Sequence, residues 1–156
     1  MASQASSILS WVASQLATIN GAGEYQNDVS ATGKIVVGSD VPTPNQVQMD
    51  PMLFVGDVTV DSVRGPNLNS FQKELQVMVW GFKATSTDTA LARTSAALDL
   101  AADVETALCG TSARRSGGGL FHDAYAATIA RDGNSAGYQG RGVCAVAVTF
   151  VYRGIV

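Results

Sequence analysis

The sequence contains little of what most enzymes, membrane proteins and disulfide-rich domains rely on. Its 156 residues include one histidine, two cysteines and four prolines, and only 15% of them are charged. No run of about 18 apolar residues occurs, so a membrane-spanning helix is not expected. The amino terminus lacks a basic segment and is already amphipathic, unlike a signal peptide. Cys109 and Cys144 form neither a disulfide framework nor a metal-ligand pattern, which favours a reducing, cytoplasmic origin.

The charge of the chain is small and slightly acidic. The formal net charge is −3, whereas tight nonspecific binding to nucleic acid needs a basic face that displaces counterions. We therefore do not expect such binding. A charged fraction below the roughly 25% of average domains also suggests that partners or other copies of the chain cover part of the surface. The alternative is an ordinary compact domain rich in Gly and Ala.

The residue types that carry out catalysis are few and poorly arranged. His122, Asp123 and Cys144 are the ingredients of a Cys/His/Asp site, but none of them lies in a known local signature. On a strand, His122 and Asp123 would point to opposite faces. One histidine and two distant cysteines cannot make a zinc site, and Gly117–Gly119 lacks the lysine of a phosphate-binding loop. The sequence predicts no catalytic residue, no metal and no cofactor, and thus a protein that is not an enzyme.

The stretch from residue 71 to residue 109 organises the predicted fold. Its first half, residues 71–84, alternates as a strand with apolar residues on both faces: Leu75, Val77 and Val79 on one, Met78, Trp80 and Phe82 on the other. Its second half predicts a helix of about five turns, capped by Thr87 or Asp88 and ended by Gly110. One stripe of this helix is apolar and should pack on a sheet: Ala97, Leu100, Ala101, Val104, Ala107 and Leu108.

The remaining chain predicts a second helix, further strands and three long loops. Residues 1–20 follow helical apolar spacing, with Ser3 as the cap and Asn20-Gly21 as the end. Strands are expected at 24–29, 34–38, 52–60, 120–131 and 143–152. The loops are rich in Pro or Gly and span about 39–51, 110–119 and 132–142. The order predicts a single α+β domain over residues 1–156, in which an N-terminal helix and the long central helix pack on one face of a mostly antiparallel sheet.

Alternation also assigns faces on these strands. One face of the strand 52–60 should carry Met52, Phe54, Val58 and Val60. One side of the strand 120–131 should carry Phe121, Tyr125 and Ile129, and one face of the last strand Val146, Val148, Phe150 and Tyr152. A turn at 64–67 should join the strands 52–60 and 71–84 into an antiparallel hairpin.

The face that carries Met78, Trp80 and Phe82 needs a cover of its own. Two helices cannot bury both sides of a sheet of four or more strands, so loops or another subunit must cover this second side, and we favour a subunit. Trp11 lies beside the apolar stripe of the first helix, where it either widens the core or meets a neighbouring subunit. These four residues form the predicted subunit interface.

Several segments together carry a resemblance to a known family. They are the amphipathic helix ILSWVASQLATI, the segment EYQNDVSATGKIVVG, and a Pro-rich joint before the strand MLFVGDVTV. The most suggestive piece is ELQVMVWGFKA followed by an Ala/Leu-rich helix that ends DLAADVETAL, and the chain closes on the strand VCAVAVTFVYRG. This layout resembles the tail terminator (tail completion) proteins of long-tailed bacteriophages. The resemblance covers most of the chain and is one of layout, not of a diagnostic motif.

The resemblance implies a structural protein of the virion. Members of that family form a six-membered ring on the head-proximal end of a finished tail tube, stop its polymerisation and present the surface on which the neck docks. The implied partners are further copies of the chain, the tail-tube protein and a neck or head-completion protein, with assembly in the host cytoplasm and no membrane. DNA would pass through the bore without specific binding. The long loops would contact tube or neck through Arg114, Arg115, Asn134, Tyr138 and Arg141.

Other interpretations stay open. The nearest is another ring-forming protein of the same virion, such as a neck completion protein or a tail-tube subunit. A different class is a monomeric binding domain that is not viral and does not self-associate. A third is a cysteine hydrolase that uses Cys144. We do not expect this activity, because Cys144, His122 and Asp123 lie in no known catalytic signature.

Overall fold

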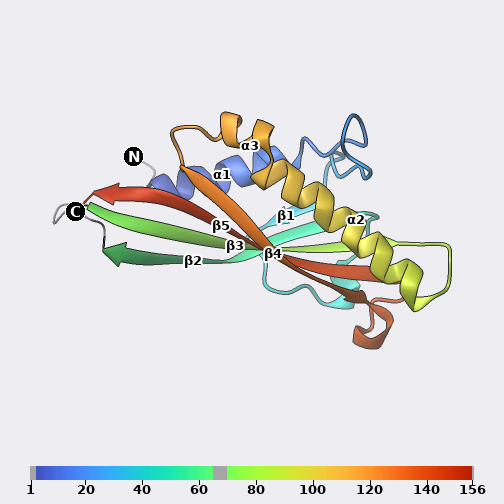
Figure 1. Cartoon of the computed structure of the whole chain (residues 1–156). Helices are drawn as coiled ribbons and strands as arrows, with labels where there is room; N and C mark the ends of the chain where they lie inside the picture. The colour runs from blue at the N-terminus through green and yellow to red at the C-terminus, as the bar shows by residue number, and fades with distance from the viewer. Residues whose placement is uncertain (1–2, 65–69, 156) are drawn as a thin grey trace.

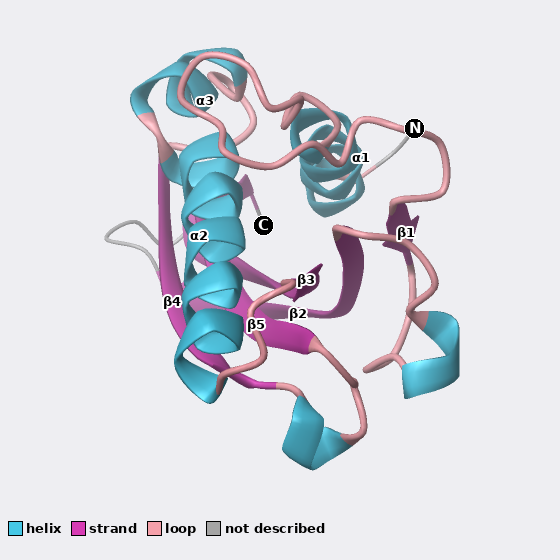
Figure 2. Ribbon diagram, turned by 90° about the vertical axis from the view of Figure 1, so that its right-hand side faces the viewer, coloured by secondary structure: helices cyan, strands magenta, loops and turns pink. Residues whose placement is uncertain are grey.

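The computed structural model describes residues 3–64 and 70–155, in which α-helices cover one face of a five-stranded sheet (Figure 1 and Figure 2). The helices are α1 (Gln4–Leu16), α2 (Ala90–Cys109) and α3 (Thr111–Ser116). The strands are β1 (Ile35–Val37), β2 (Met52–Arg64), β3 (Ser70–Ala84), β4 (Asp123–Asp132) and β5 (Arg141–Ile155). The strand order is β1-β2-β3-β5-β4, and neighbouring strands are antiparallel except β1 and β2. The predicted α+β class is confirmed.

The side of the sheet that the helices cover, here called the helix face, holds the main core. Val77 and Val79 of β3 lie opposite Val148 and Val146 of β5, and all four are fully buried. Burying each such side chain stabilises the fold by about 1.5–3 kcal/mol. The predicted stripe of α2 packs against them and is buried along its length: Ala97, Leu100, Ala101, Val104, Ala107 and Leu108.

The first helix begins as predicted but ends earlier. The Ser3 hydroxyl accepts a hydrogen bond from the Ser6 N–H at 3.1 Å, which caps α1. The helix ends at Leu16 and not at Asn20. Beyond it the Ile19 N–H donates to the carbonyl of Leu16, three residues earlier, as in a 3-10 turn. The Ile19 side chain is buried in the core.

The long helix α2 is capped one or two residues later than predicted. The side-chain oxygen of Thr89, whose backbone is extended, accepts a hydrogen bond from the Ala92 N–H at 3.1 Å. Thr87 lies outside the helix, and Asp88 binds Arg93 instead of capping. The predicted end at Gly110 is confirmed, since this residue is the C-cap.

The predicted strand at 24–29 is wrong. This segment forms turns and bends, and its only ladder contact among the described residues is an isolated bridge between Asn20 and Asp28. Its backbone bonds to a side chain instead: the N–H groups of Gln26 and Asn27 donate to the buried carboxylate of Asp103 on α2. A nonlocal partner therefore replaces the strand neighbour that the prediction assumed.

The strand β2 is longer than predicted and contains a β-bulge. The register with β3 shifts between Gly56 and Thr59, and Asp57 between them has a φ of 47°. Because the bulge inserts an extra residue, Val60 pairs opposite Leu75 and lies on the helix face. The prediction that Val60 shares a face with Phe54 is therefore wrong, while the antiparallel pairing of β2 with β3 is confirmed. The predicted turn at 64–67 falls largely outside the described residues.

The loops hold more structure than predicted. Thr111–Ser116, expected to be a flexible loop, is the helix α3, and short 3-10 helices occur at Pro44–Gln46 and Asn134–Ala136. The strand β4 begins at Asp123, so Phe121 precedes it and packs in the helix-face core. Tyr125 and Ile129 lie on β4 and are exposed, so Phe121 does not share their side as predicted.

Candidate interaction surface

The sheet face opposite the helices, here called the second face, carries a smaller apolar cluster. Met78, Trp80 and Phe82 belong to it, which confirms the predicted split of β3 into two apolar faces. Phe82 is fully buried and Trp80 is 7% exposed. The rings of Phe54 and Phe82 meet edge-on, with centroids 5.7 Å apart. Phe54, Trp80 and Phe82 thus form an inner layer, and the half-buried Met78 packs against it.

Part of the cover over this cluster comes from the chain itself. The loop between β1 and β2 lies across it, and Met49 of that loop packs against the cluster. The hydroxyl of Tyr138 donates to the Pro42 carbonyl, and its ring lies 4.7 Å from that of Phe82. Nη1 of Arg141 donates to the Met49 carbonyl at 2.8 Å. Two of the predicted contact residues, Tyr138 and Arg141, thus hold the loop in place.

The second face is open over β4. Ile129 is 70% exposed and Tyr125 is 50% exposed. Beside Ile129 lies a groove of about 210 Å³, whose walls include Val41, Trp80 and Arg131. We call Tyr125, Ile129 and this groove the β4 patch. Apolar side chains that gather beside a groove are typical of contact surfaces.

A second exposed apolar feature lies on α2. Leu91 is 78% exposed and Leu98 is 52% exposed, and a spacing of seven residues places them on one side of the helix. Because Ala97 and Leu100 face the sheet, these leucines point away from it. We call this pair the α2 ridge. The β4 patch and the α2 ridge therefore face in opposite directions.

Trp11 lies apart from the other three predicted interface residues. It packs on the helix face, with its ring centroid 5.0 Å from that of Phe121 and 5.9 Å from that of Phe150, both edge-on. It is half-buried. Trp11 thus packs against the core, and the thickness of the sheet separates it from Met78 and Trp80. A subunit contact through its exposed part stays a prediction.

The remaining predicted contact residues lie in two loops. Asn134 sits between β4 and β5, where its side-chain oxygen accepts a hydrogen bond from the Gly140 N–H at 2.8 Å. Arg114 and Arg115 lie on α3, but their side chains are outside the described residues. Sequence reasoning did not single out Ile129, Tyr125, Leu91 or Leu98 as contact residues. The sequence shows only that these residues are apolar and lie on a predicted strand or helix. Whether another part of the chain buries them is decided by tertiary packing.

Of the residues weighed for catalysis, Cys144 lies far from His122 and Asp123. Cys144 is buried, and burial raises the pKa of its thiol to about 12, so it holds its proton at neutral pH. It pairs with Ala130 on β4, about eight residues and roughly 26 Å along the strand from the exposed His122. Within the described part of the chain, no three His, Cys, Asp or Glu side chains cluster as metal ligands would.

Comparison with known protein families and with curated proteins finds no match for this chain. Among the described helices, none is long and apolar enough to span a membrane.

Proposed function

We propose that this protein is a structural virion protein that forms a ring at the head-proximal end of a bacteriophage tail tube. In this role it ends polymerisation of the tube and provides the docking surface for the head or neck. The observation that carries the proposal is the pair of exposed apolar surfaces that face in opposite directions, the β4 patch and the α2 ridge. The layout of the chain, which resembles tail terminator proteins, supports the same role.

A closed ring needs a head-to-tail interface in which two different surfaces of each copy meet. The β4 patch is concave beside Ile129, and the α2 ridge projects two leucines. We infer that the ridge of one copy seats against the patch of the next. A surface low in charge suits this role, because few charged groups need to lose water when copies associate.

The small net charge of −3 also suits a ring through which DNA moves. A bore without a basic lining displaces few counterions and holds DNA weakly, so that DNA slides through it. In this proposal the partners are other copies of the chain, the tail-tube protein and a neck or head-completion protein, and the protein resides in the virion.

Negative-stain electron microscopy of the concentrated protein, alone and with unfinished tail tubes, tests the proposal. We expect rings with a central hole and caps on tube ends. Long tubes would instead favour a tail-tube subunit, and single particles that never touch a tube would favour a monomeric binding domain. Ile129→Glu and Leu98→Glu should each abolish rings, because each buries a charge in the interface. Val37→Glu, at an exposed residue of β1 outside both surfaces, is the matched control.

Mixing the two variants tests the head-to-tail arrangement. The Ile129→Glu copy keeps an intact α2 ridge and the Leu98→Glu copy keeps an intact β4 patch, so one good interface can form between them. We expect the mixture to give dimers, by analytical ultracentrifugation, while each variant alone stays monomeric. If rings persist in both variants, these surfaces do not form the interface.

A further inference from the structure

The strand β4 forms one edge of the sheet, and its outer side has no neighbour among the described strands (Figure 2). From Tyr125 to Arg131, alternate residues direct their backbone N–H and C=O groups away from β5. Such an edge is a template on which another strand can pair. The usual protection is missing, because the pairing with β5 runs over residues 123–132 without a bulge, and residues 124–130 include no charge and no proline.

The opposite edge of the sheet is guarded. The strand β1 is only three residues long and pairs with Leu53–Val55 of β2. Beyond that segment β2 carries the bulge at Asp57 and the exposed charge of Asp61. Short strands, bulges and charges are the means by which proteins keep sheet edges from pairing. The long, uncharged edge at β4 is therefore the place where the sheet can take a further strand.

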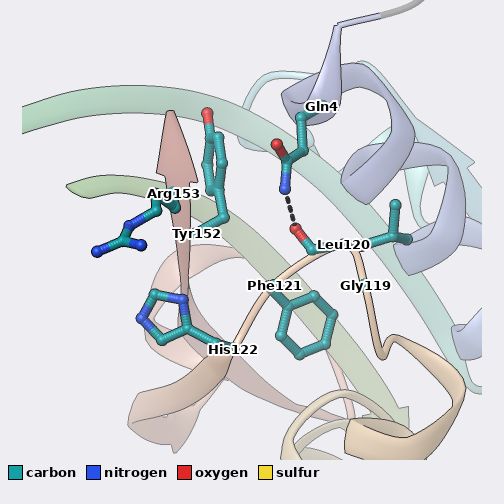
Figure 3. Close-up of a pocket in the computed structure, with 7 residues that line it drawn as sticks. All are labelled: Gln4, Gly119, Leu120, Phe121, His122, Tyr152 and Arg153. Atoms are coloured by element: carbon teal, nitrogen blue, oxygen red, sulfur yellow. Dashed lines mark hydrogen bonds between the residues drawn. The ribbon is translucent and has the colours of Figure 1, made fainter. Parts of the chain in front are cut away.

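The strand β4 is held in place at both ends. Just before it, the Gln4 side-chain nitrogen donates to the Leu120 carbonyl at 2.6 Å, so the start of α1 anchors the segment that leads into β4 (Figure 3). At its end, the Asp132 carboxylate accepts two hydrogen bonds from the Arg93 guanidinium, at 2.6 and 3.1 Å. A strand that is fixed before binding loses little conformational entropy when a partner adds to it.

The side chains of β4 match those of a second copy of the same strand. Five of them belong to the second face by alternation: Asp123, Tyr125, Ala127, Ile129 and Arg131. If two copies pair antiparallel about a twofold axis at Ala127, Asp123 of each copy lies opposite Arg131 of the other. Tyr125 then lies opposite Ile129. Opposite charges and aromatic–β-branched pairs are the cross-strand pairs that stabilise a sheet. An axis one residue to either side would place Asp123 opposite Ile129, or Arg131 opposite Tyr125.

We propose that unassembled copies of this protein pair through β4, in an antiparallel ladder with Ala127 at its twofold axis. The pair joins the two sheets into one and packs Tyr125 of each copy against Ile129 of the other. A ladder along the ten residues of β4 is roughly 33 Å long and one sheet thick, so it buries roughly 300 Å² on each copy, against roughly 800 Å² in stable complexes. The pair is therefore transient, and free copies sediment as monomers. The ring proposed above uses the same two side chains and replaces the pair, but the pairing does not depend on the ring.

Disulfide trapping tests the pair, because it captures a transient contact. The background is Leu98→Glu with Cys109→Ser, which keeps β4 intact, cannot close the proposed ring and leaves only the buried Cys144 of the native cysteines. Opposed Cα atoms in an antiparallel ladder are about 4.5–5.5 Å apart, within reach of a disulfide. With oxidised glutathione, Ala127→Cys should form a covalent dimer about tenfold faster than Ala31→Cys, because pairing raises the effective concentration of the thiols. Ala31 is the matched control, an exposed alanine before β1.

Further variants in the same background test the register. Two copies of Tyr125→Cys would hold their thiols about 14 Å apart along the strand, so this variant should not link to itself but should link to Ile129→Cys when the two are mixed. Arg131→Glu places like charges at both ends of the pair and should slow the linking of Ala127→Cys about threefold or more. Adding Asp123→Lys restores the opposite charges and should recover the rate.

The proposal is overturned if Ala127→Cys links no faster than Ala31→Cys, if Tyr125→Cys links to itself as fast as Ala127→Cys, or if the double charge reversal stays as slow as Arg131→Glu. None of these results bears on rings formed by the protein with an intact Leu98. Fast linking at Ala127 in a protein that never forms rings would contradict the ring and leave the β4 pair in place.

Discussion

Asp103 holds the segment that follows α1 onto the long helix, and its removal should be costly. The carboxylate is 2% exposed on α2. It accepts hydrogen bonds from the Asn27 N–H at 2.8 Å, from the Asn27 side-chain nitrogen at 2.9 Å, and from the Gln26 N–H at 3.2 Å. Residues 26 and 27 pair with no strand in the described part of the chain, so these bonds satisfy backbone groups that would otherwise be unpaired.

The size of the loss in the free energy of unfolding follows from the donors that Asp103→Ala leaves without an acceptor. A hydrogen bond to a charged group contributes roughly 1.5–3 kcal/mol, and an orphaned buried donor costs about 1–3 kcal/mol. Because Gln26 is exposed and can bond to water, we count mainly the two donors of Asn27 and expect a loss of about 3–5 kcal/mol in the free energy of unfolding. That is a large fraction of the roughly 5–15 kcal/mol that stabilises a typical domain.

Urea denaturation followed by far-UV circular dichroism measures this loss. Asp99→Ala is the matched control, because Asp99 lies one turn earlier on α2 and is exposed, and it should change the stability by less than about 0.5 kcal/mol. Asp103→Asn should fall between the two, since an amide keeps one acceptor oxygen but presents a donor to the other N–H groups. If Asp103→Ala is no less stable than Asp99→Ala, the segment is held by apolar contacts alone and the reasoning fails.

Three further outcomes are expected. The hydrogen bonds from Arg93, at 2.6 Å to the nearer oxygen, hold the pKa of Asp132 below its ordinary value of 3.8. Their contribution is therefore complete above about pH 5 and lost as the pH falls through the lowered pKa, so acid titration of unfolding should be shallower in Asp132→Asn than in the wild type. Gly142→Ala should cost about 3 kcal/mol or more in a denaturant series, because its Cβ would lie 1.8 Å from the Arg93 carbonyl oxygen; a cost below about 1 kcal/mol would mean that α2 can shift. In a Cys109→Ser background, Cys144 should not react with a thiol reagent at pH 8 until the chain unfolds, and rapid labelling of the native protein would contradict its burial.

The fold could be predicted largely because its central pieces are locally periodic. Alternation along residues 71–84 placed Val77 and Val79 on one face and Trp80 and Phe82 on the other, and the structure agrees. The apolar stripe of α2 was read from helical spacing in the same way. Each pattern is set by the geometry of the element itself, and burial of such a face is the main favourable term in folding.

The errors lie where a distant residue decides the local structure. Asp103 replaces a strand partner for residues 26 and 27, and the bulge at Asp57 moves Val60 to the other face. No local sequence pattern predicts the contact of Asp103 with residues 26 and 27 or the bulge at Asp57. The candidate surfaces were only half predicted for the same reason: apolar residues on the second face were visible, but which of them a loop covers was not.

The sequence by itself determined the α+β class, the two-sided apolar strand β3 and the buried stripe of α2, because periods of two and of about 3.6 residues are properties of a single element. Only the tertiary structure decided that Phe82 is sealed beneath the loop between β1 and β2, and that Ile129 is left open. It also decided that the carboxylate of Asp103 on α2 reaches the backbone of residues 26 and 27. These relations join residues far apart in the chain, and their geometry is set by how sheet, helices and loops pack together.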